Sequence, residues 1–416
     1  MSAPALVEDF FRHEYGKLVA TLSRRVGTQF LDDVEDAAQS ALMKALQIWP
    51  SAGLPANPSA WLFRVAHNDL MGVMRQRTGR SRILEQLAAE HSNALGGNTE
   101  VFLDGEIEDD LLRMLFACCD SAIPVESQLV LALRTLCGFD IREIALRLFT
   151  TEANVYKRLG RACNRLREVP LRLGELSGED CATRLSAVHS ILYLMFTEGY
   201  LSVQPEKTIR RELCGESIRL ATLLANHPAG KKPETFALLA LMHLQSARMD
   251  SRLDASSGLL LLEEQDRSLW DRRQIEVGIE WLGKSASGEQ FTRYHAEAGI
   301  AAEHCLAPSF EETRWDKIVH CYSILDGIAP STIHWLNRAV AVAEWKGPEA
   351  GLAILKGLEP PTWLEGSYMW VAVLADLHRR CGNVEQAGHY REIAIDLAPT
   401  SAVRNLLMRR LQHTSK

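Results

Sequence analysis

Two short segments of this 416-residue sequence concentrate basic side chains, which bind phosphates and base edges. Residues 61–82 contain five arginines and one acidic residue, Asp69. Residues 152–172 contain six basic residues and two acidic ones. Each segment therefore carries a formal charge of +4, although the whole chain carries −7. Two basic segments within an acidic protein predict two local contacts with nucleic acid.

The second basic segment has the pattern of a helix with two different faces. Its apolar residues follow at spacings of four, three and four, which places them together: Val155, Leu159, Ala162 and Leu166. Its long polar residues lie opposite: Asn154, Lys157, Arg158, Arg161 and Arg165. A recognition helix needs an apolar stripe for packing and long donors for DNA. A charged surface helix of a bundle has the same spacing, so both interpretations stay open on spacing alone.

A second helix is expected just before this one. Asp140 and Glu143 form a capping-box pattern at its start. Residues 149–151 then provide a turn in which Thr150 or Thr151 can cap the following helix. Two short helices joined by a tight turn predict a helix-turn-helix.

The remaining sequence predicts an all-α protein, because apolar residues recur with a period near 3.6 and alternating β-branched runs are missing. We expect a first helical domain at 1–80, an acidic linker at 81–110, a second domain at 111–173 and, after a polar hinge, a helical extension. The extension divides into residues 181–300 and a repeat-like part, 301–416. In that last part Ile-Ala-Pro at 328–330 and Leu-Ala-Pro at 397–399 lie 69 residues apart, close to two periods of a tetratricopeptide (TPR) repeat.

Composition and motifs exclude several classes of protein. Apolar residues make up 47% and charged residues 24%, which is typical of a soluble globular chain, and no apolar run is long enough for a membrane span. The first ten residues lack a signal peptide, so we expect a cytoplasmic protein without membrane contact. Nine scattered cysteines without a CxxC pair indicate reduced thiols. Four histidines fall on helical patterns without metal-ligand spacing: His189, His243, His295 and His334. With no phosphate-binding loop or nucleophile motif either, we expect no enzyme activity, no cofactor and no metal.

Residues 139–167, including Ile141-Arg142-Glu143-Ile144-Ala145, resemble region 4 of extracytoplasmic-function (ECF) RNA polymerase sigma factors. Residues 33–42 resemble region 2.2 of the same family, and residues 57–68 resemble its −10 region. The matches occur in the family's order, with an acidic linker between them. Ser40 in place of a common acidic residue and Ala153-Asn154 in place of a frequent Gly-Thr depart from the family pattern.

This resemblance implies partners and site residues. Region 2.2 docks on the β′ clamp of core RNA polymerase, and the β subunit is a further expected partner. The residues it implies for polymerase binding are Asp33, Asp36, Gln39 and Leu42. For the −10 element of promoter DNA they are Trp61, Arg64, Asn68, Arg75 and Arg77. For the −35 element they are Glu152, Asn154, Lys157, Arg158, Arg161 and Arg165. Trp61 also has the helical spacing of a core residue, so base stacking and core packing are both open for it.

The extension looks like that of an ECF subgroup with a TPR-containing C-terminus. Residues 192–200 and 265–271 carry this part of the resemblance. Glu198 in the first segment and Asp266, Arg267 and Asp271 in the second are expected to be buried, mutually paired charges that hold a helix corner rather than line a polar pocket. We expect the extension to control activity, through contact with either the DNA-binding domains or a protein partner. Two other functions stay open: a one-component transcription regulator with a sensing extension, and an enzyme whose catalysis lies in residues 181–300.

Overall fold

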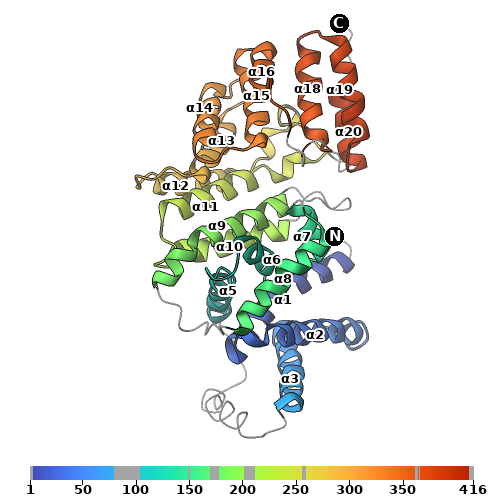
Figure 1. The fold of residues 1–416 in the computed structure, drawn as a ribbon, viewed down its shortest axis with the longest axis vertical. Helices are drawn as coiled ribbons and strands as arrows, with labels where there is room; N and C mark the ends of the chain where they lie inside the picture. The colour runs from blue at the N-terminus through green and yellow to red at the C-terminus, as the bar shows by residue number, and fades with distance from the viewer. Residues whose placement is uncertain are drawn as a thin grey trace. The chain divides into compact units, whose positions relative to one another are not determined.

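A computed structural model of the chain describes residues 3–78, 104–148, 150–168, 178–200, 211–254, 259–360, 364 and 366–411. Throughout these residues the regular secondary structure is helical and contains no strand (Figure 1). The prediction of an all-α fold is confirmed.

The chain divides into two compact units, and the three boundaries between them fall inside α9, near the start of α10 and between α10 and α11. The N-terminal unit comprises Met1–Met195 and Gly215–Gly230, and the C-terminal unit comprises Phe196–Cys214 and Lys231–Lys416. The helices up to the first boundary are α1 (Ala3–Val26), η1 (Thr28–Phe30), α2 (Leu31–Ala52), α3 (Pro58–Thr78), α5 (Asp104–Cys118), α6 (Val125–Thr135), α7 (Ile141–Arg147), α8 (Glu152–Glu168) and α9 (Gly178–Tyr200). The later ones are α10 (Arg211–Asn226), α11 (Pro233–Ser246), η2 (Met249–Arg252), η3 (Leu262–Glu264), η4 (Arg267–Leu269), α12 (Arg272–Ser285), α13 (Arg293–Leu306), α14 (Trp315–Ile328), α15 (Thr332–Lys346), α16 (Pro348–Leu355), α18 (Tyr368–Arg380), α19 (Val384–Asp396) and α20 (Ser401–Arg410).

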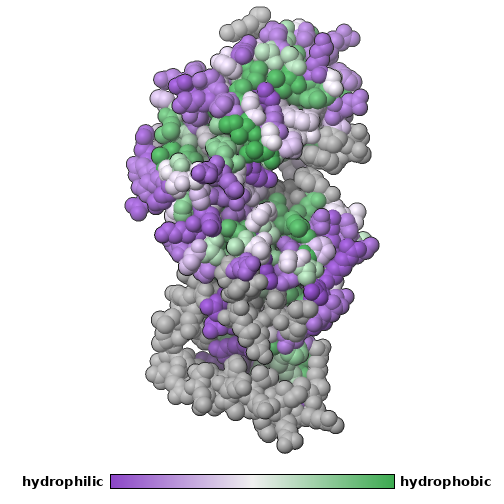
Figure 2. Space-filling model, turned by 60° about the vertical axis from the view of Figure 1, so that its left-hand side comes forward, coloured by the Kyte–Doolittle hydropathy of each residue, from purple (hydrophilic) through white to green (hydrophobic). Residues whose placement is uncertain are grey.

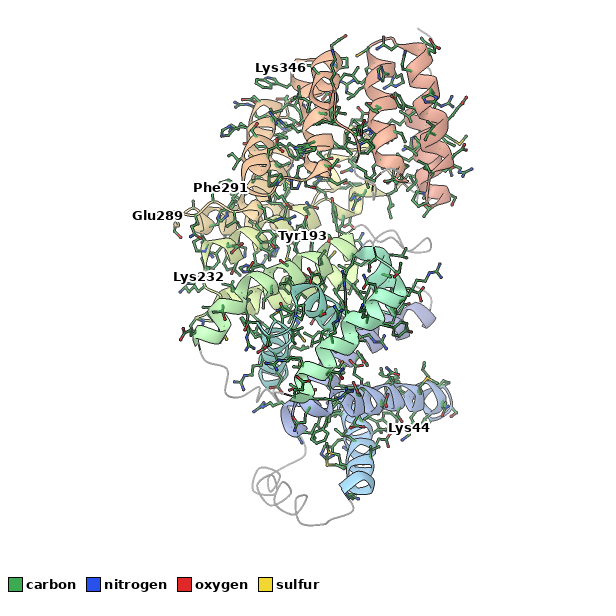
Figure 3. The ribbon with its side chains drawn as sticks, in the orientation of Figure 1. Lys44, Tyr193, Lys232, Glu289, Phe291 and Lys346 are labelled. Carbon is green, nitrogen blue, oxygen red and sulfur yellow. The ribbon has the colours of Figure 1, made fainter. Side chains whose placement is uncertain are left out.

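The two helices that carry the first predicted site, α2 and α3, are clamped to each other. The side chain of Asn57 accepts a hydrogen bond from the N–H of Ala60 at 2.9 Å and so caps the start of α3. Asp69 of α3 accepts hydrogen bonds from Lys44 at 2.7 Å and from Ser40 at 2.8 Å, both on α2. Lys44 is labelled on α2 in Figure 3. These contacts fix which faces of the two helices point outward.

Helix α1 packs against α5 and α6 of the same unit. A Cβ atom at Gly16 would clash with the carbonyl oxygen of Leu136, so the backbones approach at a distance that only glycine allows. Arg24 of α1 donates a hydrogen bond to Asp110 of α5 at 2.9 Å, and Asp110 is only 2% exposed. Asp110 lies in α5, which begins at Asp104, so the last part of the range that we expected to be a linker with some fragmentary helix is helical. Residues 81–103 of the predicted linker lie outside the described residues.

The start of the extension belongs to the N-terminal unit. Helix α9 begins at Gly178, so the end of the expected hinge is helical, while residues 169–177 lie outside the described part of the chain. Arg184 of α9 donates to the carbonyl oxygen of Phe116 at 3.1 Å and to Asp120 at 2.7 Å. A chain cut near Leu173 would therefore lose residues that pack within this unit.

The C-terminal unit is an array of packed helix pairs. Neighbouring helices pair in order: α11 with α12, α13 with α14, α15 with α16, and α18 with α19. Buried apolar clusters join successive pairs, for example around Ile318 and Val342 and around Leu336 and Trp370. The motifs at 328–330 and 397–399 lie at the ends of α14 and α19, each the second helix of a pair. Hydrophobic and hydrophilic residues mix on the surface of this array (Figure 2).

Candidate polymerase and nucleic-acid interfaces

The outward face of α2 carries a stripe of polar and apolar side chains. Asp36, Gln39, Met43 and Leu46 follow at spacings of three, four and three, which places them on one face of the helix, and all four are exposed. The exposed fractions of Met43 and Leu46 are 57% and 47%. Asp36 and Gln39 thus lie on the exposed face that we expected. The two apolar residues were missed, although their helical spacing from Gln39 was a sufficient signal.

Two other residues predicted to bind polymerase lie differently on α2. Asp33 is only 8% exposed, because it lies on the side of α2 that includes the buried Val34 and Ala37. Leu42 is half-buried. Asp33 therefore lies off the exposed stripe of α2.

The buried side of α2 also holds an unusual carboxyl group. Glu35 is half-buried, and burial is the main cause that raises its pKa to about 7. The positive charge of Arg134 opposes this effect, while the nearby carboxylates of Asp32 and Asp36 add to it. Glu35 therefore carries a proton for part of the time at neutral pH.

The outward face of α3 presents two of the predicted −10 arginines and the predicted asparagine. Arg64, Asn68 and Arg75 are exposed, and their spacings of four and seven align them along one face. Neither arginine forms an ion pair with a described residue. The carboxylate of Asp69 pairs with Lys44 on α2. It therefore does not neutralise the positive charge of Arg64 and Arg75. The side chain of Arg77 lies outside the described residues.

The aromatic residues of α3 lie partly within the fold. Trp61 is half-buried, and its ring meets that of Trp49 edge-on at 5.5 Å between centroids. The ring of Phe63 stacks with His67 at 5.9 Å and lies 4.9 Å from the guanidinium carbon of Arg25. These contacts support core packing for Trp61.

The second predicted site is built from α7, a tight turn and α8. The side chain of Asp140 accepts a hydrogen bond from the N–H of Glu143 at 2.7 Å, and Glu143 accepts from the N–H of Asp140 at 2.8 Å. This confirms the predicted capping box. The hydroxyl of Thr151 accepts from the N–H of Asn154 at 3.3 Å, and Thr150 accepts from the Asn154 side chain at 2.9 Å. Both threonines therefore stabilise the start of α8.

Helix α8 separates its apolar and basic residues as the sequence predicted. Val155, Ala162 and Leu166 are buried, whereas Leu159 is only half-buried. On the opposite side Glu152, Lys157 and Arg161 are exposed, while Asn154, Arg158 and Arg165 are half-buried. The outermost donors are consequently Lys157 and Arg161.

Two further features of α8 were not predicted. Tyr156 is 61% exposed next to Lys157 and offers an aromatic face beside the basic side chains. Near the end of the helix Arg167 pairs with Asp32 of α2, and Arg165 lies 3.6 Å from Glu168. The exposed aromatic could have been found from its position on the basic face, but the contact with Asp32 depends on tertiary packing.

The polar residues at 265–271 cap helices, whereas we expected buried, mutually paired charges: Asp266 and Asp271 are exposed. Asp266 accepts from the N–H of Ser268 at 2.9 Å, and Asp271 caps α12 by accepting from the N–H of Arg273 at 2.9 Å. Arg267 donates to the carbonyl oxygens of His304 and Ala307, at 2.7 and 2.8 Å, where α13 ends. These contacts hold a helix corner. Among the described residues there is no group of three His, Cys, Asp or Glu side chains that could hold a metal ion.

A comparison with protein-family models matches residues 10–90 to Sigma-70 region 2. This segment includes the whole of α2 and α3, with the exposed residues described above. A second match assigns residues 184–286 to a family of unknown function (DUF6596). A Sigma-70 region 2 supports a role as an RNA polymerase sigma factor and implies binding to core polymerase and promoter DNA.

Among curated proteins, an uncharacterized protein of Rhizobium meliloti (strain 1021) is 34% identical over 385 residues, which cover 92% of this chain and 90% of that protein. The chain belongs to the same family as this protein. The shared length spans both compact units, so the family has the extension as well as region 2. No solved structure matches the chain. In the part that the structure describes, no helix has the length and apolar character that a bilayer span requires.

Proposed function

We propose that the chain is a sigma factor of the ECF type, which binds core RNA polymerase, directs it to specific promoters and assists DNA melting. The observation that carries this proposal is the outward face of α3, within the segment that matches Sigma-70 region 2. Arg64 and Arg75 lie exposed there without an ion-pair partner among the described residues, with Asn68 between them. Guanidinium groups bind the strand backbone, and an amide can donate to and accept from a base edge.

The exposed stripe of α2 supports a role in docking on the polymerase. Asp36 and Gln39 provide polar contacts with a basic clamp, and Met43 and Leu46 provide apolar area beside them. Interfaces commonly combine such an apolar centre with a polar rim. The proposal therefore extends the docking face from Gln39 to Leu46.

The α7–turn–α8 segment supports a second promoter contact as a helix-turn-helix that reads the −35 element. Lys157 and Arg161 lie outermost, Arg158 lies beside them, and Tyr156 adds an aromatic face. In this arrangement the buried Val155 and Leu166 fix the helix, and the basic residues contact phosphates and base edges.

For the extension we propose control of sigma activity through a TPR-like helical array. The boundaries of the compact units indicate where the chain can be cut to test this control. A chain that ends after Gly230 retains every segment of the N-terminal unit and loses most of the C-terminal unit. A cut near Leu173 would instead remove Arg184 and its contacts with Phe116 and Asp120.

The experiment is run-off transcription from genomic fragments by core polymerase, with the full-length chain and with a chain cut after Gly230. Promoter-specific transcripts that require both core polymerase and the full-length chain support the proposal, and a large change in yield after the cut supports control by the extension. Circular dichroism of the cut chain checks that its helices remain. Sequence-specific DNA binding without any dependence on core polymerase would instead indicate a one-component regulator.

A further inference from the structure

The C-terminal unit contains a cavity of about 690 Å³. Its walls come from the segment 261–264 and from helices α13, α14, α15, α18 and α20. One wall is apolar or aromatic and includes Phe310, Trp315, Ile318, Tyr322 and Val340. The other wall carries four arginines: Arg379, Arg380, Arg409 and Arg410. Cavities of roughly 300–1,000 Å³ that combine apolar walls with a few polar groups are typical of small-molecule sites.

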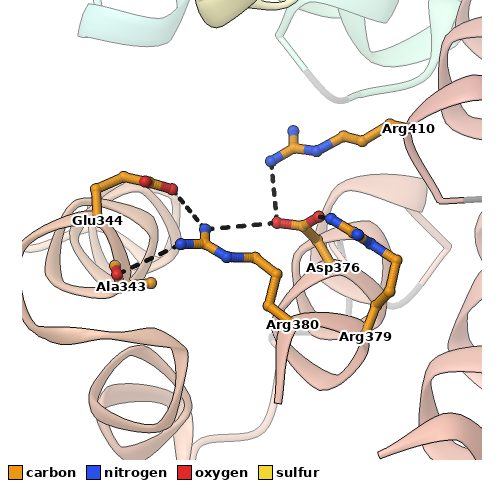
Figure 4. Close-up of polar contacts among 6 residues, drawn as sticks. All are labelled: Ala343, Glu344, Asp376, Arg379, Arg380 and Arg410. Carbon is orange, nitrogen blue, oxygen red and sulfur yellow. Dashed lines mark hydrogen bonds and ion pairs between the residues drawn. The ribbon is translucent and has the colours of Figure 1, made fainter. Parts of the chain in front are cut away.

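Three of the arginines converge on a single buried carboxylate (Figure 4). Asp376, only 4% exposed, accepts from Arg379 at 2.9 Å and from Arg410 at 3.2 Å, and it lies 3.9 Å from Arg380. Arg380 also donates to Glu344 at 2.5 Å. Burial alone would raise the pKa of Asp376, but the charge of Arg410, with the hydrogen bond and charge of Arg379, lowers it below its usual value. The cavity lining as a whole carries four arginines and four carboxylates, because Glu263 and Glu264 line it as well, and Arg409 pairs with Glu264 at 2.9 Å.

The arginine wall has more donors than its carboxylates occupy. Each guanidinium group carries five N–H donors, and the described contacts use only some of them. The Nε atom of Arg379 is buried and has no hydrogen-bond partner in the described structure. A buried donor without a partner is unfavourable, so an added acceptor at this wall would be stabilising.

Two further arginines, Arg248 and Arg267, lie near His304 but outside the lining of the cavity. His304 lines the cavity, and the Nδ1 atom of this residue is buried without a described partner. Burial, followed by the charges of Arg248 and Arg267, lowers the pKa of His304 to about 3, so its ring is neutral at pH 7. Neither of these two arginines forms an ion pair with a described residue.

We propose that this cavity binds a small organic anion, a carboxylate or phosphate ester attached to an apolar or aromatic body. The anionic group would accept hydrogen bonds from Arg380 and Arg410, and the apolar body would contact Trp315 and Ile318. The volume of the cavity, about 690 Å³, matches a small molecule better than an extended peptide. The role of such a ligand as an effector of transcription rests on the proposed sigma function, but its binding does not.

The test uses phenyl phosphate as a probe, titrated into the full-length chain by isothermal calorimetry. Inorganic phosphate provides the charge without the ring, and benzyl alcohol provides the ring without the charge. We expect phenyl phosphate to bind more tightly than either. Because binding is measured without polymerase or DNA, a failed titration and a failed transcription assay are distinguishable.

Two arginine variants and a matched control locate the site. Arg380→Met and Arg410→Met should each weaken phenyl phosphate binding by about tenfold or more, because each removes a charge-assisted hydrogen bond. Arg338→Met is the control, since Arg338 has a similar side-chain exposure and pairs with Asp326 at 2.5 Å but does not line the cavity. The affinity of the Arg338→Met variant for phenyl phosphate should stay at the wild-type value. Val340→Trp, which fills the cavity without removing a charge, should abolish binding even if an arginine variant fails to fold.

Loss of binding in Val340→Trp and in the folded arginine variants, with binding retained in Arg338→Met, supports the proposal. No heat of binding with phenyl phosphate would overturn it, as would equal affinity in all four variants. Binding of an acidic, aromatic octapeptide in place of phenyl phosphate would also overturn it, in favour of a protein partner.

Discussion

Two sets of arginine side chains, one in each unit of this protein, have opposite environments. On α3 and on the outer face of α8, Arg64, Arg75 and Arg161 are exposed and form no ion pair with a described residue. In the C-terminal unit, Arg379 and Arg380 are partly buried and share carboxylates with neighbouring helices. The first set is available to a polyanion outside the molecule. The second set is held by the protein around a cavity, which favours a small ligand.

Two buried carboxyl groups differ in the same way. Asp376 lies among three arginines, and its pKa is lowered even though burial opposes this. Glu35 faces only Arg134 and two like charges, so burial dominates and its pKa rises to about 7. The comparison teaches that the number of cations around a buried carboxyl group decides its charge at neutral pH.

The largest expected effect comes from the carboxylate at the centre of the arginine cluster. Asp376→Ala should lower the free energy of unfolding by about 3–5 kcal/mol, because it leaves partly buried guanidinium groups uncompensated. Urea denaturation measures this loss. Asp316→Ala is the control, since its pair with Arg314 is exposed to solvent and should contribute little to stability. An equal loss of unfolding free energy in both variants would mean that the buried arginine cluster contributes no more to stability than an exposed ion pair.

The basic side chains Arg158 and Arg161 of α8 should affect DNA binding and leave stability unchanged. Arg158→Ala and Arg161→Ala should each cost about 1–3 kcal/mol of affinity for promoter DNA if they contact a base, as measured by fluorescence anisotropy of the polymerase complex. Arg142→Ala, at an exposed site on α7, provides the folded control. Wild-type affinity in both α8 variants would contradict the −35 assignment.

The Glu35 carboxyl group should make the stability of the N-terminal unit depend on pH. Its folded pKa of about 7 lies above the unfolded value of about 4.3, so the folded state retains its proton more strongly. The stability that this proton supplies is present below about pH 4.3 and is lost as the pH rises through about 7. In the wild type, the free energy of unfolding should therefore fall between pH 5 and pH 8. In Glu35→Gln this fall should be smaller by about 1–2 kcal/mol, which urea midpoints at the two pH values measure. An unchanged difference would mean that Glu35 is ionised in the folded protein.

The smallest expected effect concerns the apolar part of the α2 stripe. Met43→Ala and Leu46→Ala should each weaken binding to core polymerase by about 1 kcal/mol, because each removes apolar area from the interface. Titration of labelled protein with core polymerase measures this change. Ile48→Ala is the matched control, since Ile48 is 42% exposed but lies off the stripe. A loss in the Ile48 variant equal to that of Leu46 would place the interface elsewhere on α2.

The sequence predicted the helices and local caps because these depend on neighbouring residues. The capping box of Asp140 and Glu143 and the apolar stripe of α8 are examples. Burial of Asp33 and the helical state of residues 104–110 could not be predicted, because both depend on packing between distant segments, such as the pair of Arg24 with Asp110. The cavity was missed for the same reason. Its arginines lie in two sequence-local pairs, on α18 and α20, and only the fold brings them together.

The most direct test of the sigma assignment is promoter opening by core polymerase, followed through 2-aminopurine fluorescence at the −10 element. With the full-length chain we predict opening that requires both the chain and core polymerase. The triple variant Arg64→Ala, Asn68→Ala, Arg75→Ala should bind core polymerase normally but fail to open the promoter, because it lacks the outward face of α3. Opening by this variant at the wild-type rate would contradict the −10 assignment, and no opening by the wild-type chain at any promoter it binds would contradict the sigma assignment itself.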